Sequence, residues 1–333
     1  MNYIIKRVGQ VFITIWAVIT LTFAMIRLIP GGPMDFIRAQ LMQQNPGQDR
    51  EAINRIAQAY TNINPDQPLY IAYYEYMAAM LTGDMGRSFY YGRPVSEIIA
   101  NALPWTLFIM SLGGLMVFGI GIVLGSLLGY YEGTRFDKSG TIVGILMDSI
   151  PFYVMGILLL IFFGYRRDWF PRGGAYSSRT VDPGLHMEFI VNIVHHAALP
   201  SLSYGLTAFG MIALLMRGNC ISVLGSDFMR VAELRGLPER KIALGYLGRN
   251  AILPMYTELL IAIAFMIGGS VILEEIFSYP GIGLRMLNGI YARDTPLMMG
   301  TFIIVTVAVA IGMFVADLTY GKIDPRIKVG ESE

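Results

Sequence analysis

Two carboxylates, Asp148 and Glu258, interrupt long apolar segments of the chain. A carboxylate at the centre of a membrane-crossing helix costs about 2.5–3.5 kcal/mol on insertion scales, so it usually faces water or a partner. Asp148 precedes the kink-prone Pro151, and it either faces a water-filled pathway or pairs with a neighbouring helix or partner chain. Glu258 lies near the start of its segment, from which its side chain can also reach the membrane surface. Both residues are candidates for polar groups along a transport pathway.

A short charged segment supplies the second candidate site. Within residues 226–254, the pattern predicts a helix that begins at a Ser or Asp cap, ends at Gly236 and restarts with Pro238 in its first turn. A compact amphipathic helix of this kind suits docking into a groove on a soluble partner, and an ordinary solvated loop is the alternative. Its apolar residues are Phe228, Met229, Val231 and Ala232, and its charged residues are Arg230, Glu233 and Arg235.

Motifs for enzymatic chemistry are missing from the sequence. The phosphate-binding loop of an ATPase needs Gly-x-x-x-x-Gly-Lys-Ser/Thr, and the segments around Lys138 and Lys322 lack either the glycine or the hydroxyl. His195 and His196 are adjacent, so on a helix they point about 100° apart, and no carboxylate or cysteine lies beside them. We interpret them as polar residues at a membrane entrance. The chain is therefore expected to hydrolyse no ATP and to hold no metal.

The composition predicts a polytopic membrane protein. Of 333 residues, 54% are hydrophobic and 15% are charged, whereas soluble proteins average about 25% charged residues. The mean hydropathy is +0.53, and the charges are concentrated between long uncharged runs. These features, with a single cysteine, exclude a soluble enzyme, a secreted disulfide scaffold and a disordered chain. The net charge of +1 provides no basic field for nucleic acid.

Six apolar segments are long enough to cross a bilayer, which takes roughly 20 residues per helix. They are residues 8–26, 105–130, 141–165, 197–216, 255–273 and 297–316. Gly121, Gly125 and Gly129 recur every four residues and predict a close helix–helix seam, either inside the subunit or between subunits. The sequence therefore predicts an all-α integral membrane protein with six transmembrane helices.

Basic residues set the expected orientation. With the N-terminus inside, the cytoplasmic connections hold 13 Lys and Arg residues and the short external connections hold 6, so both termini are expected in the cytoplasm. The chain then divides into the N-terminus with the first span (1–30), a long external loop (31–104) and a five-helix core (105–333). The first loop has helical stretches at 50–59 and 69–81. The core has an external loop at 166–196 and its main cytoplasmic loop at 226–254.

Several motifs, in order along nearly the whole chain, resemble one family. Ala232-Glu233-Leu234-Arg235-Gly236, followed by Asn250-Ala251-Ile252-Leu253-Pro254, resembles the EAA loop of bacterial and archaeal ATP-binding-cassette (ABC) importer permeases. The spacing between that glycine and that proline is similar to the spacing in dipeptide/oligopeptide permeases of the DppB/OppB kind. Further matches are Arg27-Leu28-Ile29-Pro30-Gly31-Gly32-Pro33, Asp66-Gln67-Pro68-Leu69, Gly83-Asp84-Met85-Gly86-Arg87-Ser88, Arg293-Asp294-Thr295-Pro296 and Ser278-Tyr279-Pro280-Gly281.

The resemblance implies a type I ABC importer permease fold with an enlarged external first loop, located in the cell membrane. It implies half of a translocation pathway for di- or oligopeptides. The partners it implies are a second homologous permease subunit (DppC/OppC-like), two cytoplasmic ATPase subunits and an extracytoplasmic solute-binding protein. ATP and Mg would be bound by the ATPase subunits, and this chain would hold no cofactor. The ATPase-coupling residues would be Asp227, Phe228, Arg230, Ala232, Glu233, Arg235, Gly236 and Leu237.

Two alternatives stay open at this stage. Within the same family, the cargo could be an oligosaccharide or nickel, since selectivity rests largely with the binding protein. Outside the family, the chain could be a stand-alone channel or an ion-coupled transporter. That class predicts transport by this chain alone and buried charge pairs along several spans.

Overall fold

The computed structural model describes residues 2–28, 33–44, 46–63, 67–239, 241–266 and 270–323. This part of the chain is helical, and its only β feature is an isolated bridge between Arg87 and Pro94, so the expected all-α class is confirmed for it. In chain order, with η for a π-helix, the elements are α1 (Asn2–Arg27), α2 (Pro33–Gln44), α3 (Arg50–Thr61), α4 (Leu69–Leu81), α5 (Val95–Tyr130), α6 (Arg135–Asp148), α7 (Phe152–Leu159), η1 (Leu160–Arg166), α8 (Met187–Leu224), α9 (Asp227–Leu234), η2 (Lys241–Gly248), α10 (Arg249–Ala251), α11 (Leu253–Met266), α12 (Val271–Ile276), α13 (Ile282–Tyr291) and α14 (Thr295–Ile323).

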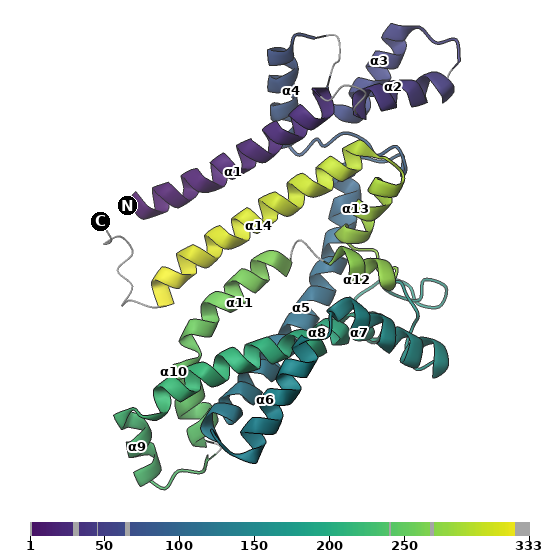
Figure 1. Ribbon diagram of the computed structural model, residues 1–333. Coiled ribbons are helices and arrows are strands. Elements are labelled where there is room, and N and C mark those ends of the chain that lie inside the picture. Colours follow the sequence, from purple (N-terminus) through teal and green to yellow (C-terminus); the bar gives the residue numbers. More distant parts are fainter. Residues whose placement is uncertain are drawn as a thin grey trace.

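Helices α5 and α8 pack closely against each other and form the centre of the fold (Figure 1). A Cβ atom at Gly125 of α5 would lie 2.4 Å from the carbonyl oxygen of Ala213, and one at Gly129 would lie 2.4 Å from Cβ of Cys220. Glycine is therefore required at both positions, because any larger residue would force the two backbones apart. The predicted glycine seam is confirmed, and it lies inside this subunit.

Both central helices begin earlier than the expected spans. Helix α5 begins at Val95 instead of residue 105, and α8 begins at Met187 instead of residue 197. The expected start of α5 is wrong because Pro104 lies inside the helix, where membrane helices tolerate proline if neighbouring groups satisfy the freed backbone. The start of α8 is capped by His186, whose Nδ1 accepts a hydrogen bond from the Phe189 amide at 3.2 Å. The end of the expected loop 166–196 is thus helical.

The continuous span expected over residues 141–165 is wrong. Helix α6 ends at Asp148 and α7 begins at Phe152, and the two parts are bent by 88°. Pro151 has no amide hydrogen to donate to the preceding turn, and its backbone is extended (φ −56°, ψ 134°). Helical hydrogen bonding therefore stops before it and starts again after it.

Four helices in the described residues are long and apolar enough to cross a membrane: Ile5–Arg27, Val95–Tyr130, Met187–Leu224 and Thr295–Val315. The bent pair of α6 with α7 and η1 makes a fifth if it is counted as one span. The remaining expected segment, 255–273, is divided, because α11 ends at Met266 and α12 begins at Val271. Residues 267–269 lie outside the described part. The described structure thus contains four or five candidate spans.

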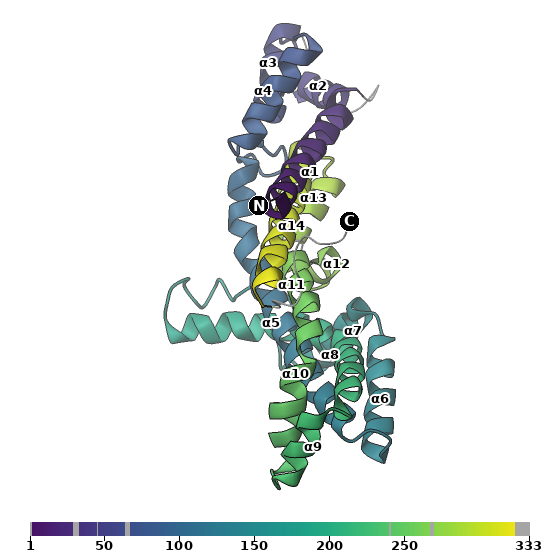
Figure 2. The same cartoon turned by 90° about the vertical axis from the view of Figure 1, so that its left-hand side faces the viewer.

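Three helices occupy the segment between the first two candidate spans. Helices α3 and α4 confirm the helical stretches predicted at 50–59 and 69–81, and α2 is an additional helix. Helix α4 packs on α1, since Tyr73 Oη lies 2.7 Å from Thr20 Oγ1 and the Tyr73 ring meets the Phe23 ring edge-on. The two views agree that α2–α4 lie at one end of the molecule and α9 at the other (Figures 1 and 2).

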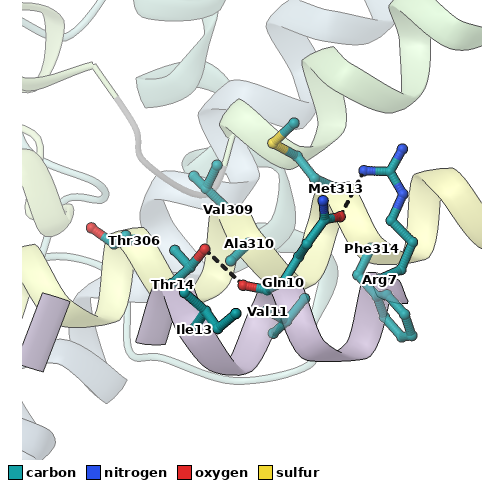
Figure 3. A pocket seen from close by; sticks show the side chains of 10 residues that line it. All are labelled: Arg7, Gln10, Val11, Ile13, Thr14, Thr306, Val309, Ala310, Met313 and Phe314. Carbon is teal, nitrogen blue, oxygen red and sulfur yellow. Dashed lines mark hydrogen bonds between the residues drawn. The ribbon is translucent and has the colours of Figure 1, made fainter. Parts of the chain in front are cut away.

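Helices α1 and α14 lie side by side (Figure 1). Between them is a groove of about 460 Å³. Most of its lining side chains are apolar, and Arg7 Nη1 donates a hydrogen bond to Gln10 Oε1 at 3.1 Å at one end of it (Figure 3).

Candidate functional site

A short amphipathic helix, α9, follows the long helix α8. It starts directly after Ser226, whose carbonyl oxygen accepts a hydrogen bond from the Met229 amide at 3.1 Å. Gly236 ends it with a φ of +62°, a left-handed conformation in which side chains are strained. The next helical turn starts at Pro238, whose carbonyl accepts a bond from the Lys241 amide at 2.8 Å. The predicted start, glycine stop and proline restart are all confirmed.

One face of α9 is buried in the fold. Met229 and Ala232 are each 1% exposed. They belong to an apolar cluster that joins α9 to α5, α8, η2 and α10 and that includes Phe118 of α5 and Met216 of α8. Leu237, just after the helix, is partly buried against the same cluster. Within this cluster α9 packs on η2, which in turn packs on α5 and α8.

The opposite face of α9 presents apolar side chains to solvent. Val231 is 52% exposed and Leu234 is 82% exposed. Arg230 and Arg235 lie beside them and are also exposed. We call these four residues the α9 surface. Apolar side chains next to arginines on an exposed helix are typical of a protein-interaction surface.

The remaining predicted residues of this segment lie at the ends of α9 or outside the described side chains. Asp227 is exposed in the first turn, and Gly236 is exposed in the turn that ends the helix. The side chains of Phe228 and Glu233 lie outside the described part. The structure thus brings the predicted residues onto one helix and the turn after it, with Ala232 buried instead of available to a partner.

Two polar contacts join neighbouring elements in this part of the fold. Tyr131, just after α5, donates a hydrogen bond to Glu239 Oε2 at 2.7 Å, and that bond raises the pKa of Tyr131. Arg217 of α8 donates from Nη2 to Oδ2 of Asp137, in the first turn of α6, at 2.8 Å. Asp137 is buried, and its hydrogen bonds with the Arg217 guanidinium hold its pKa down to about 2. Asp137 therefore stays charged at neutral pH.

Asp148 and Glu258 do not form a common site. Asp148 is the last residue of α6, exposed at the bend before Pro151 instead of lying inside a continuous span. Glu258 is exposed in the second turn of α11. Neither residue enters an ion pair in the part of the chain that the structure describes. A role for either in a pathway stays a prediction.

The two adjacent histidines make separate contacts. His195 Nε2 lies 2.9 Å from the Trp169 carbonyl oxygen, and His196 Nδ1 lies 2.9 Å from the Asn192 carbonyl oxygen. No group of three metal-ligating side chains occurs among the described residues. Their interpretation as polar residues at a membrane entrance stays a prediction.

Sequence reasoning missed a buried carboxylate, Glu274 of α12, which is 0% exposed. Thr106 of α5 donates to Glu274 Oε1 at 2.8 Å, and the Leu284 amide of α13 donates to Oε2 at 2.9 Å. Glu274 therefore joins three helices. Ser270 could have indicated this helix from the sequence, because its side chain caps α12 by accepting a hydrogen bond from the Leu273 amide at 3.3 Å. A cap at that position marks a new helix within what reads as a continuous apolar run.

A second missed carboxylate, Asp294, is 0% exposed and precedes α14. Its Oδ1 accepts a hydrogen bond from the Leu297 amide at 3.2 Å, and its Oδ2 accepts one from the Tyr90 amide at 2.9 Å. The Ser88 hydroxyl also donates to Oδ2. Asp294 thereby attaches the loop before α5 to the start of α14. The signal was Asp followed by Thr-Pro, which is typical of a helix N-terminus.

Similarity to known proteins identifies the family of this chain. The family described as "Binding-protein-dependent transport system inner membrane component" matches residues 121–329, which include the three glycines of the seam, Gly121, Gly125 and Gly129, together with α8 and α9. The chain belongs to this family. It is therefore the membrane-embedded permease component of a transport system.

Individual permeases match this one over its whole length. The oligopeptide transport system permease protein AppB of Bacillus subtilis is 30% identical over 328 residues, which are 98% of this chain and 99% of AppB. The dipeptide transport system permease protein DppB of Lactococcus lactis is 31% identical over 336 residues, with the same coverage of both chains. The glutathione transport system permease protein GsiC of Salmonella typhimurium is 28% identical over 328 residues. The similarity thus includes α1–α4, which precede the family match.

Proposed function

We propose that this permease is one of two homologous membrane subunits of an ABC importer for short peptides. The three relatives named above are permeases for oligopeptides, dipeptides and glutathione, which is itself a peptide, and each aligns with 98% of this chain. None of these three names points to an oligosaccharide or nickel. In the proposed complex, ATP and Mg are bound by two ATPase subunits, and this chain holds no cofactor.

The arrangement of the helices supports a topology with six spans and both termini in the cytoplasm. The N-terminal end of α1, the C-terminal end of α14 and α9 all lie toward the left of Figure 1, and α7, α12 and α13 lie toward the right. The excess of Lys and Arg falls on the connections of the left side, which is the cytoplasmic side by the positive-inside rule. The helices α2–α4 and the segment before α8 then lie outside, where a solute-binding protein docks.

The observation that carries the proposal is the division of α9 into two faces. Met229 and Ala232 bury one face of α9 in the cluster that η2 shares with α5 and α8, and Val231 and Leu234 are left exposed to meet an ATPase subunit. ATP binding closes the ATPase pair and displaces the attached α9 helices. Because α9 packs on η2 and η2 packs on the central helices, that displacement moves them as a rigid body and shifts the population between two transporter conformations.

A substitution on the α9 surface tests this function. Leu234→Asp places a charge where the proposal requires an apolar contact, so uptake of radiolabelled tri-alanine by the complete transporter in proteoliposomes should fall at least about tenfold. Lys138→Asp is the matched control, because Lys138 is exposed near the start of α6 and outside the α9 surface. Uptake equal to wild type in the Leu234→Asp transporter would overturn the assignment. Uptake by this chain alone would favour a channel instead.

A further inference from the structure

A polar pocket lies at the end of α5 that is farthest from α9. Its volume is about 320 Å³, within the range of roughly 300–1,000 Å³ typical of small-molecule sites. The pocket lies between the start of α5, α13 and the loop that precedes α5. Its lining residues are Tyr91, Arg93, Glu97, Ile98, Asn101 and Arg285. Five of these six residues are polar or charged, whereas most residues that line the groove between α1 and α14 are apolar (Figure 3).

The hydroxyl oxygen of Tyr91 accepts two hydrogen bonds, and its hydrogen is not donated to any described residue. Arg285 Nη1 donates to Tyr91 Oη at 2.8 Å, and Asn288 Nδ2 donates to the same oxygen at 2.9 Å. A phenol oxygen accepts about two hydrogen bonds and donates one, so both acceptor positions are occupied. The O–H of Tyr91 itself has no acceptor among the described residues. It is therefore available to an acceptor that enters the pocket.

The guanidinium of Arg285 makes two contacts with Tyr91 and no close ion pair in the described part of the chain. Besides its hydrogen bond, its Cζ lies 5.2 Å from the centre of the Tyr91 ring, a cation–π distance. No carboxylate lies within ion-pair distance of Arg285 in the described part of the chain. One edge of the guanidinium is used by Tyr91, and its other N–H groups remain for a ligand. A guanidinium without a close ion pair, beside a hydroxyl that can still donate, is suited to a carboxylate.

The pocket also contains one negative charge. Glu97 lies 3.7 Å from Arg93, and the side chains of both are at least half exposed, at 50% and 68%. Two guanidinium groups and one carboxylate thus line a single cavity. A short peptide in water carries a carboxylate at one end and an ammonium group at the other, and the cavity offers a group of opposite charge to each.

An exposed strip of α5 starts at this pocket. Glu97, Asn101, Pro104, Ser111 and Leu115 follow one another at helical spacing, and all are exposed although most of the opposite face of α5 is buried. In a two-subunit permease, such a strip on a central helix is available to the second subunit or to the translocation pathway. A pathway along this strip would have the pocket at its outer end.

We propose that this pocket receives the C-terminal carboxylate of a peptide at the outer mouth of the pathway. The carboxylate accepts hydrogen bonds from Arg285 and from the Tyr91 hydroxyl, and Glu97 faces the ammonium end. The inference rests on the proposed function, because it names a site through which the imported peptide passes. It assigns recognition of a peptide terminus to the permease itself, in addition to any recognition by the binding protein.

Direct binding without the binding protein tests the site. The probes are tri-alanine and its C-terminal amide, and their affinities for the purified complete transporter in lipid nanodiscs are measured by saturation-transfer NMR. Wild type should bind tri-alanine about tenfold more tightly than the amide, the expected effect of losing one charged hydrogen-bonding pair. Arg285→Gln and Tyr91→Phe should each lower the affinity for tri-alanine by a similar factor and remove the preference for the free acid. Arg285→Lys should keep part of the preference.

Arg179→Gln is the matched control, because Arg179 is exposed on the loop before α8 and does not line the pocket. Equal binding of acid and amide by wild type, absence of any binding, or an Arg285→Gln variant with unchanged preference would overturn the inference. An Arg285→Gln variant that loses only stimulation by the binding protein would assign the pocket to docking of that protein instead. Failure of wild type to take up tri-alanine would contradict the proposed function separately, whatever the variants do.

Discussion

Arg217 and Asp137 form a two-point ion pair that links α8 to the first turn of α6. The guanidinium donates from Nε to Oδ1 and from Nη2 to Oδ2, the latter at 2.8 Å. The Asp137 side chain is only 3% exposed and the Arg217 side chain 27%. The pair thus fixes α6 to α8, the helix that precedes α9 in the chain.

Replacement of Asp137 by Asn should destabilise the permease by about 1–3 kcal/mol. The substitution removes the charge that Arg217 pairs with and leaves its guanidinium partly buried without a full partner. Thermal unfolding in detergent measures the effect. Asp182→Asn, at an exposed position outside this contact, is the control and should leave the melting temperature unchanged.

The stabilisation by this pair should depend on pH only in acid. The pKa of Asp137 falls from its ordinary 3.8 to about 2 in the folded protein. A lowered carboxyl pKa stabilises the fold fully above the unfolded value, and this stabilisation is lost as pH falls through the folded value. The difference in melting temperature between wild type and Asp137→Asn should therefore stay constant from about pH 5 to pH 8. A difference that varied across that interval would contradict the assignment.

The glycine seam predicts opposite outcomes for two neighbouring glycines of α5. A Cβ at Gly125 would lie 2.4 Å from the Ala213 carbonyl oxygen, whereas a Cβ at Gly119 meets nothing within 4 Å. Gly125→Ala should cost about 1–3 kcal/mol through overpacking, and Gly119→Ala should be neutral or slightly stabilising. The yield of folded protein and its melting temperature are the readouts. Equal tolerance of both substitutions would argue against the packing of α5 on α8.

The buried contact between Thr106 and Glu274 can be dissected with two conservative variants. Thr106→Val removes the donor to Glu274 Oε1 and the acceptor of the Ile282 amide, and both of these bonds measure 2.8 Å. Unpaired buried groups should lower stability by about 1–3 kcal/mol. Thr106→Ser keeps the hydroxyl and should recover most of that loss. If Val and Ser behave alike in thermal unfolding, the hydrogen bonds do not contribute as described.

Gly225 precedes α9 and Gly236 follows it. Alanine substitutions at these two positions test whether Gly236 fixes the C-terminal end of α9. Neither would bring a Cβ within 4 Å of another group, but φ is +62° at Gly236 and −77° at Gly225. Gly236→Ala should therefore cost about 1 kcal/mol and weaken the end of α9, while Gly225→Ala should have little effect. Hydrogen exchange of the α9 amides distinguishes the two, since only the first variant should exchange faster. Similar protection in both would show that the glycine does not fix the helix end.

Features with a local cause could be predicted from the sequence. The apolar runs identify the long helices, the recurring glycines identify the seam, and Gly236 with Pro238 identifies the end of α9, because each depends on residues within one or two turns. The prolines show the limit of local reasoning. Pro104 lies inside α5 and Pro200 inside α8, whereas Pro151 separates α6 from α7.

Contacts between distant parts of the chain could not be predicted. Thr106 and Glu274 are 168 positions apart, and Tyr91 and Arg285 are 194 apart. Each pair depends on how α12 and α13 pack against α5, which no periodicity encodes. For the same reason, the sequence suggested Asp148 and Glu258 as polar groups of interest, although both are exposed and the carboxylates buried in the described part of the chain are Glu274, Asp294 and Asp137.

The central claim is that the α9 surface contacts an ATPase subunit, and a site-specific crosslink tests it most directly. A photoreactive amino acid at position 234 replaces an 82% exposed leucine, and the same group at position 138 serves as the control. On illumination of the complete transporter, position 234 should crosslink to an ATPase subunit and position 138 should not. An intact transporter in which position 234 gives no such crosslink would contradict the account.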